Sequence, residues 1–210
     1  MLVVGLTGGI ASGKTVVSKM LKDLGALIID ADEISREVVA PQTRCWEKLV
    51  SSFGKEILQE DLTLDRKKLA DRVFNNPKEL LTLNSLIHPE IMERIDDRLL
   101  AIKEKNPELI VIIDAALIIE TGMYEKYDKL IVVCAGEKTQ IERILHRDEL
   151  SQDEAKKRIH SQLPLRDKIK IADFVIENEG ALSKTKEQVE KVFNTISSLK
   201  SAQGSVIKKM

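Results

Sequence analysis

The sequence is poor in cysteine, histidine and aromatic residues, and these shortages exclude several classes of protein. Its two cysteines, Cys45 and Cys134, cannot build a disulfide framework, and its three histidines add no spacing typical of a metal site. Aromatic residues make up only 3% of the chain, so the core must rest on Leu, Ile, Val and Ala. Apolar runs are also short, because the first stops at Gly5 and Asp114 interrupts the run 109–119. We therefore expect no signal peptide or membrane span, and a soluble, cytoplasmic protein.

Length and charge limit the architecture and the partners. A chain of 210 residues can bury roughly 70% of its unfolded surface, which suits one α/β domain with insertions. The formal net charge of −1 argues against binding of nucleic acid or membrane by bulk electrostatics. We expect a monomer or a weak homo-oligomer whose partner is a small-molecule substrate.

Several apolar runs are continuous rather than alternating, which is typical of strands that are covered on both faces. Helical patterns separate them, so the sequence predicts a parallel sheet built from strand–helix–strand units. The fold class is α/β, a three-layer fold with a five-stranded parallel sheet, a helical insertion and a helical lid. The five expected strands are Leu2–Leu6, Ala26–Ile29, Leu109–Ile113, Leu130–Cys134 and Phe174–Ile176.

Long stretches between the strands lack any convincing strand pattern. Local signals there are helical: Asp65 can cap a helix, Asn76 precedes a proline at the first helical position, and Ser151 opens a capping box. Pro89 is expected to break or restart its helix. We predict one domain over 1–200 with its core at 1–33, 106–148 and 171–200, a helical insertion at about 34–105, a lid at about 149–170 and a frayed tail at 201–210.

One motif carries most of the chemistry. The segment Gly8–Thr15 matches G-x-x-x-x-G-K-[ST], and it lies between an expected strand and an expected helix. Glycines let such a loop wrap an anion with successive backbone N–H groups, and the helix N-terminus adds its positive end. The alternative is a glycine-rich turn with a surface lysine. The predicted nucleotide-binding residues are Gly8, Gly9, Ile10, Ala11, Ser12, Gly13, Lys14, Thr15 and Val16.

Other classes of phosphate-loop protein lack support in this chain. A switch GTPase would need a D-x-x-G and an N-K-x-D motif, and neither occurs at the required spacing. An ABC-type ATPase would need L-S-G-G-Q, which is also missing. A small-molecule kinase remains. Its basic lid would lie in 156–170, although a run of charges is more commonly a solvated face.

Several further segments, read together with the phosphate loop, form one ordered pattern along the chain. They are Gly5–Thr15, Ile29–Asp32, Leu64–Arg66 with Leu69, Val73 and Phe74, His88-Pro89, Gln140–Arg143, Arg147-Asp148, and Ala172-Asp173 with Val175-Ile176, Asn178 and Gly180. In these segments the chain resembles the dephospho-coenzyme A kinases. The similarity covers about residues 3–180, and one stretch departs from it: Ala115–Glu120 stands where the family typically has Pro-Leu-Leu-Phe-Glu.

The resemblance implies that ATP phosphorylates the ribose 3′-hydroxyl of dephospho-coenzyme A, the last step of coenzyme A synthesis. Asp32 would then accept the hydroxyl proton, although it or Asp30 could simply cap the following helix. Arg66 and His88 would contact the acceptor. For His88 the alternative is a histidine at a helix stop.

The remaining candidate residues concern the phosphates and the metal. Lys14 would bridge the β- and γ-phosphates, while the Thr15 hydroxyl and Asp114 would hold Mg²⁺, unless Asp114 is only an exposed acid at a strand end. Arg147 is the candidate lid cation, and Arg143, one turn earlier, could make a salt bridge instead. Asn178 would lie near the adenine ring, or merely form a tight turn.

Two alternatives to this function stay open. The first is another small-molecule kinase, acting on a nucleoside, a nucleotide or a sugar acid. The second is a module that binds nucleotide without turnover. Lys14, Thr15 and Asp32 are all intact, which argues against the second alternative.

Overall fold

The computed structural model describes residues 1–74, 76–148 and 150–207 of the chain. These residues form two compact units, each described here by itself. Unit 1 comprises Met1–Ile29 and Asn106–Met210, and unit 2 comprises Asp30–Lys105.

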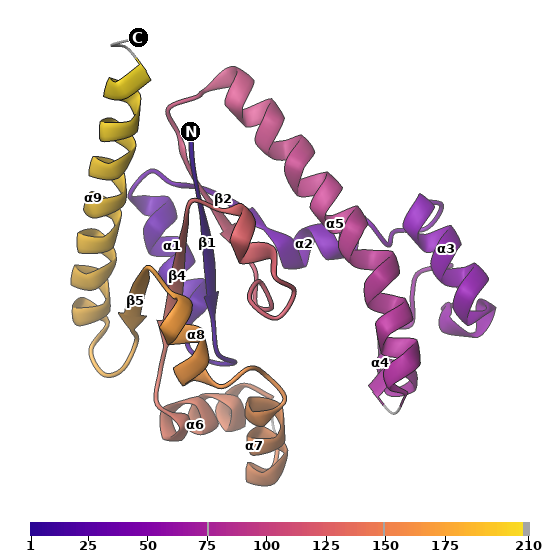
Figure 1. The fold of residues 1–210 in the computed structure, drawn as a ribbon. Coiled ribbons are helices and arrows are strands. Elements are labelled where there is room, and N and C mark those ends of the chain that lie inside the picture. Colours follow the sequence, from indigo (N-terminus) through magenta and orange to yellow (C-terminus); the bar gives the residue numbers. More distant parts are fainter. Residues whose placement is uncertain (75, 149, 208–210) are drawn as a thin grey trace. The chain divides into compact units, whose positions relative to one another are not determined.

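The strands form a single five-stranded sheet in the order β2-β3-β1-β4-β5 (Figure 1). β1 pairs in parallel with β3 and β4, and β4 pairs in parallel with β5. This confirms the predicted five-stranded parallel sheet and α/β fold. The strand bounds are β1 Leu2–Gly8, β2 Leu27–Asp30, β3 Ile110–Asp114, β4 Lys129–Cys134 and β5 Phe174–Glu177.

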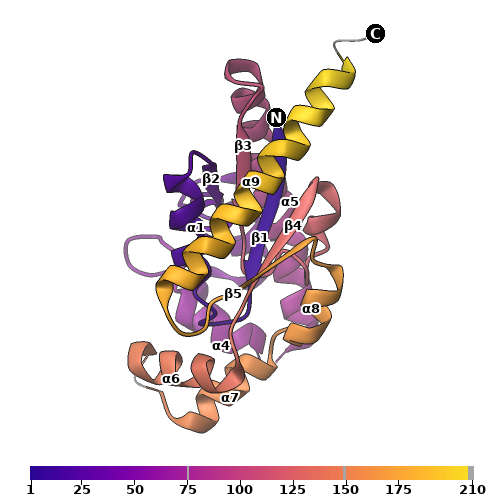
Figure 2. The ribbon, with the colours of Figure 1, turned by 90° about the vertical axis from the view of Figure 1, so that its left-hand side faces the viewer.

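Helices α1 (Lys14–Asp23) and α9 (Leu182–Ile207) pack on one face of this sheet (Figure 2). Leu2, Val4 and Leu6 of β1 share a buried cluster with α1 and α9 side chains. On the other face, a Cβ added at Gly5 would meet Ile118 at 2.9 Å. The segment after β3 therefore covers this face, and β1 is buried on both sides, as its continuous apolar run predicts.

Unit 2 is helical. Its elements are α2 (Ala31–Glu37), α3 (Arg44–Phe53), the short helix η1 (Lys55–Ile57), α4 (Arg66–Phe74) and α5 (Pro77–Lys105). Within this unit α5 packs against α2, α3 and α4. Caps begin the helices where the sequence predicts them: the Asp65 carboxylate accepts from Lys68 N, and the Asn76 side chain accepts from Glu79 N.

The expectation that Pro89 interrupts its helix is wrong, because α5, which is 29 residues long, runs through Pro89 without a break. A proline inside a helix removes one hydrogen bond and crowds the preceding turn. Packing of α5 against three other helices of the unit offsets that local cost.

The carboxyl half of unit 1 contains η2 (Met123–Lys126), α6 (Glu137–Asp148), α7 (Gln152–His160) and α8 (Leu165–Ile171). α6 and α7 lie at the end of unit 1 toward which β1 points (Figure 1). The predicted capping box is confirmed: Ser151 Oγ accepts from Glu154 N, and the Glu154 carboxylate accepts from Ser151 N at 2.9 Å. α9 is helical to Ile207, past the expected start of the tail, and residues 208–210 lie outside the described part of the chain.

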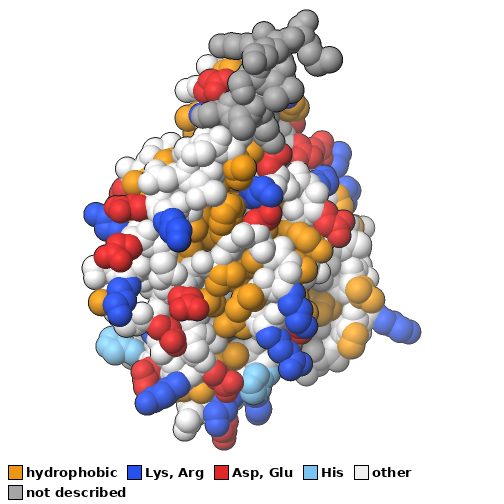
Figure 3. Space-filling view, turned by 60° about the vertical axis from the view of Figure 1, so that its left-hand side comes forward, with side chains coloured by type: hydrophobic (Ala, Val, Ile, Leu, Met, Phe, Trp, Pro, Cys, Tyr) orange, Lys and Arg blue, Asp and Glu red, His pale blue; other side chains and the backbone are white. Residues whose placement is uncertain are grey.

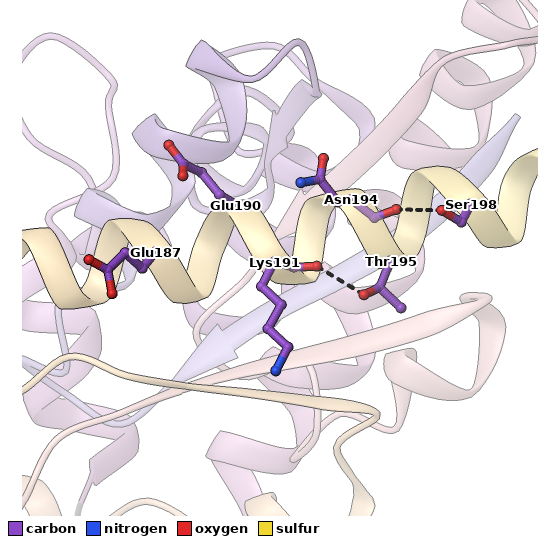
Figure 4. Close-up of a pocket in the computed structure, with 6 residues that line it drawn as sticks. All are labelled: Glu187, Glu190, Lys191, Asn194, Thr195 and Ser198. Atoms are coloured by element: carbon purple, nitrogen blue, oxygen red, sulfur yellow. Dashed lines mark hydrogen bonds between the residues drawn. The ribbon is translucent and has the colours of Figure 1, made fainter.

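Other functional features of the described surface would be patches of one charge, membrane-spanning helices or grooves. Basic and acidic side chains are interspersed on the face shown in Figure 3. In the described residues no helix is long and apolar enough to cross a membrane. A groove of about 510 Å³ follows the outside of α9 (Figure 4), but its Thr195 and Ser198 hydroxyls bond to carbonyls of the same helix. Its polar groups do not converge on one point, so it is no candidate site.

Candidate active site

The phosphate loop joins the end of β1 to the start of α1. Two of its residues have positive φ, Ala11 at 56° and Gly13 at 89°. A Cβ at Gly13 would lie 1.9 Å from Asn178 Nδ2, so only glycine fits there. The loop is thus closely packed against the residue that follows β5, and its conformation is held from outside.

Asn178 and Arg143 supply this support. The Asn178 amide donates to Ser12 O at 2.8 Å and accepts from Thr185 Oγ1 at 3.0 Å. Arg143 donates to the carbonyls of Ala11, Ser12 and Asn178 at 3.1, 3.2 and 2.8 Å. Hydrogen bonds from a charged donor are the stronger kind. Arg143 therefore braces the loop rather than making the salt bridge considered from sequence, and contact between Asn178 and the nucleotide stays a prediction.

Two glutamines hold the peptide groups of Ile10. Gln140 belongs to a segment that matches the family resemblance, whereas no sequence signal selected Gln162. Gln140 of α6 donates to Ile10 O at 2.7 Å, and Gln162 accepts from Ile10 N at 2.9 Å. The signal for Gln140 was available, because Gln140 and Arg143 are three residues apart on one helix and so share a face.

Lys14 makes an ion pair with Asp114, the last residue of β3. Asp114 is only 5% exposed, so the lysine provides the charge that a buried carboxylate needs. The alternative interpretation of Asp114, as an exposed acid at the strand end, is therefore wrong. Thr15 and Val16 begin the exposed side of α1 next to this pair.

Two oxygen donors suited to Mg²⁺ adjoin the Lys14–Asp114 pair, one within it and one on the residue that follows Lys14. Asp114 contributes a carboxylate and Thr15 a hydroxyl, and Mg²⁺ in nucleotide sites typically uses one or two protein oxygens plus phosphates and water. In the described part of the chain no cluster of three or more His, Cys, Asp or Glu residues could hold a metal. The residues present thus fit a metal that arrives with its nucleotide.

A cavity of about 540 Å³ lies beside the phosphate loop. It is bounded by Gly9, by Gln140 of α6, and by the connector between α7 and α8. The connector residues that line it are Gln162, Leu163 and Pro164. The cavity has both polar and apolar walls and room for part of a substrate.

Arg147, the predicted lid cation, binds Asp148 through two hydrogen bonds of 2.6 and 2.8 Å. This pairing holds the pKa of Asp148 below its usual range. The Arg147 side chain is 59% exposed. Among the described residues its hydrogen bonds are with Asp148, whereas Arg143 is the arginine that contacts the phosphate loop.

In unit 2, Asp30 and Asp32 have different roles. Asp30 is the N-cap of α2, and its carboxylate accepts from Asp32 N at 2.8 Å and Glu33 N at 3.1 Å. Asp32 lies in the first turn with an exposed side chain. The capping role that could have explained Asp32 therefore belongs to Asp30.

The other two candidates of unit 2 lie on α4 and α5. Arg66 lines a cavity of about 460 Å³ together with Arg36 and Lys67, which gives this cavity three basic residues. His88 is half-buried on α5, and burial lowers the pKa of its imidazole. Burial therefore favours the neutral imidazole, which can donate or accept a hydrogen bond.

Comparison with known proteins agrees with this arrangement. The family model for dephospho-CoA kinase matches residues 2–184. A dephospho-CoA kinase of Carboxydothermus hydrogenoformans is 43% identical over 187 residues, covering 89% of this chain and 90% of that protein. One from Bacillus cereus is 44% identical over 190 residues, covering 90% and 94%. The solved structure of the Campylobacter jejuni dephospho-CoA kinase superposes with a TM-score of 0.70 at 30% identity, covering 93% of this chain and 97% of that one.

Proposed function

The chain belongs to the dephospho-CoA kinase family, and we propose that Lys14, Asp32 and Arg147 are the residues that carry its reaction. It is an ATP-dependent kinase that phosphorylates the ribose 3′-hydroxyl of dephospho-coenzyme A, giving coenzyme A and ADP. The observation that carries the assignment of residues is the phosphate loop, whose lysine is intact and whose backbone is held by Asn178 and Arg143.

In the proposed step the 3′-oxygen forms a bond to the γ-phosphorus as the bond to the β–γ bridging oxygen breaks. Asp32 takes the hydroxyl proton, and ADP leaves with the electrons of the broken bond. Asp32 follows the end of β2, and ligands of open parallel sheets bind at the carboxyl ends of the strands. Lys14 and Arg147 contribute positive charge where the transferring phosphate gains negative charge.

We also propose that Thr15 and Asp114 hold Mg²⁺. The metal, when bound with ATP, neutralises charge on the β- and γ-phosphates. Asp114 accepts from Lys14 through one carboxylate oxygen, and a carboxylate has a second oxygen that could serve the metal or its water shell.

Acceptor identity is tested directly. We expect dephospho-coenzyme A, incubated with enzyme, ATP and Mg²⁺, to gain the mass of one phosphate while ADP appears in equal amount. Coenzyme A is the matched control, since it differs only by already carrying the 3′-phosphate, and it should gain nothing. Preferential phosphorylation of a nucleoside, nucleotide or sugar acid would show that the acceptor is that molecule and not dephospho-coenzyme A. ATP hydrolysis that no acceptor stimulates would favour a module that binds nucleotide without transferring phosphate.

The cavity in unit 2 is a proposed site for the acceptor's diphosphate, because Arg36, Arg66 and Lys67 supply positive charge there. We expect Arg66→Ala to raise the KM for dephospho-coenzyme A by about tenfold, the effect of losing roughly 1.4 kcal/mol of binding, with the KM for ATP unchanged. Lys78→Ala, an exposed residue of α5, is the control and should leave both constants unchanged. Equal changes in the two KM values would contradict an acceptor role for Arg66.

A further inference from the structure

A buried ion pair joins α8 to the segment that follows β3. The Lys168 side chain on α8 is fully buried, and its ammonium lies 2.7 Å from Glu120 Oε1. That contact does not have hydrogen-bond geometry, and the ammonium has no hydrogen-bond partner in the described residues. Burial of an ammonium is unfavourable without an opposite charge. The charge of Glu120 is therefore what allows Lys168 to remain inside unit 1.

Glu120 also binds the connector that precedes α8. Its Oε1 accepts from Leu163 N at 3.3 Å, in addition to its contact with Lys168. One carboxylate thus fixes the connector at Leu163 and α8 at Lys168. The connector and the start of α8 line the cavity next to the phosphate loop, so their position decides the shape of that space.

The residue next to Leu163 reaches the phosphate loop itself. Gln162 Oε1 accepts from Ile10 N at 2.9 Å, opposite Gln140, which donates to Ile10 O. Ile10 precedes Ala11, whose φ of 56° is rare for a residue other than glycine. A loop with such a conformation needs support from its surroundings. Gln162 provides part of that support, and its own position depends on the connector.

We propose that Glu120 is a positioning residue for the phosphate loop. Through Lys168 and Leu163 it holds the connector where Gln162 can bind Ile10 N, so that the loop is ordered before nucleotide arrives. The proposal rests on the proposed function, because the loop serves phosphate transfer there. Glu120 itself touches no substrate in this scheme.

Binding of ADP relative to AMP is the specific readout, since AMP lacks the β-phosphate that the loop surrounds. We expect Glu120→Gln and Gln162→Ala each to weaken ADP binding by about three- to tenfold, the usual range for one lost hydrogen bond, with AMP binding unchanged. The Ile10 amide should exchange its hydrogen faster in both variants. Glu125→Gln and Gln152→Ala, exposed residues of η2 and α7, are the matched controls and should bind both nucleotides normally.

A double-mutant cycle then tests whether Glu120 acts through Gln162. If it does, the double variant Glu120→Gln with Gln162→Ala should have the same ADP affinity as whichever single variant binds ADP less tightly. Additive losses, or wild-type ADP binding and Ile10 exchange in folded Glu120→Gln, overturn the proposal. If Glu120→Gln fails to fold, Lys168→Met is added to remove the unpaired ammonium, and the cycle is run in that background. No acceptor is present in these measurements, so their outcome is separate from the acceptor assay.

Discussion

Lys14→Ala is expected to lower kcat by about a hundredfold or more, the usual consequence of removing one preorganised charge or donor from a transition state. The lysine of a phosphate loop acts on the β- and γ-phosphates, where negative charge shifts during transfer. Because ATP keeps its contacts with the loop backbone, the KM for ATP should rise less than kcat falls.

The structure adds a second effect of this substitution, which the sequence did not predict. Lys14 pairs with Asp114, and these side chains are only 17% and 7% exposed. Alanine at position 14 leaves the carboxylate buried without its cation, so the free energy of unfolding should fall by roughly 3 kcal/mol.

Replacing both Lys14 and Asp114 by uncharged residues separates the effect on kcat from the effect on stability. Lys14→Met with Asp114→Asn removes both charges and should recover much of the thermal stability, while kcat stays low. Lys19→Ala, an exposed lysine of the same helix, is the control and should change neither quantity. Both kcat and the thermal midpoint are measured on the same preparations. Turnover at the wild-type rate in Lys14→Ala would remove this lysine from the mechanism.

The sheet and the phosphate loop were predictable because their signals are local. Each strand of the sheet contains all or most of the apolar run that predicted it, and its observed ends lie close to the predicted ones, as with Leu130–Cys134 and the observed Lys129–Cys134. Glycines and Lys14 mark the loop in the same direct way. The Ser151 capping box was predictable for the same reason, since four consecutive residues contain all of its hydrogen bonds.

Contacts between distant segments were not predictable. Gln162 reaches Ile10 across 152 positions, and Lys168 is one of several lysines in a charged stretch that resembles a solvated face. Lys168 is buried because Glu120 lies beside it in the fold, and the spacing of apolar residues along the sequence does not show that the two residues are neighbours. Pro89 failed as a helix stop because packing of α5 within unit 2 outweighs a local preference.

Asp32→Asn is expected to lower kcat by about a hundredfold to ten-thousandfold, the range for losing a general base. A ribose hydroxyl is a poor nucleophile at neutral pH, and the loose transition state makes orientation as important as basicity. Asparagine keeps the shape and one acceptor oxygen but cannot take the proton. ATP binding should change little, because the phosphate loop is untouched.

The thermal stability of the variants shows whether Asp32 has a capping role in addition to a catalytic one. Asp30, not Asp32, accepts the hydrogen bonds that begin α2, so Asn at position 32 leaves the cap in place. Asn at position 32 does remove the favourable placement of a negative charge in the first turn, which amounts to about 0.3–1 kcal/mol. Asp30→Ala removes the cap and should cost roughly 0.5–2 kcal/mol. The thermal midpoint should therefore fall further in Asp30→Ala than in Asp32→Asn.

Glu33→Gln is the matched control for charge, because Glu33 is an exposed acid in the same helical turn as Asp32. If loss of negative charge in that turn were enough to slow the reaction, Glu33→Gln and Asp32→Asn would lower kcat alike. If Asp32 is the base, kcat falls only in Asp32→Asn while both variants melt near the wild-type midpoint. Near-wild-type turnover in Asp32→Asn would contradict the assignment of Asp32 as the catalytic base. Helix capping could not then explain why an aspartate stands at position 32, because Asp30 is the residue that caps α2.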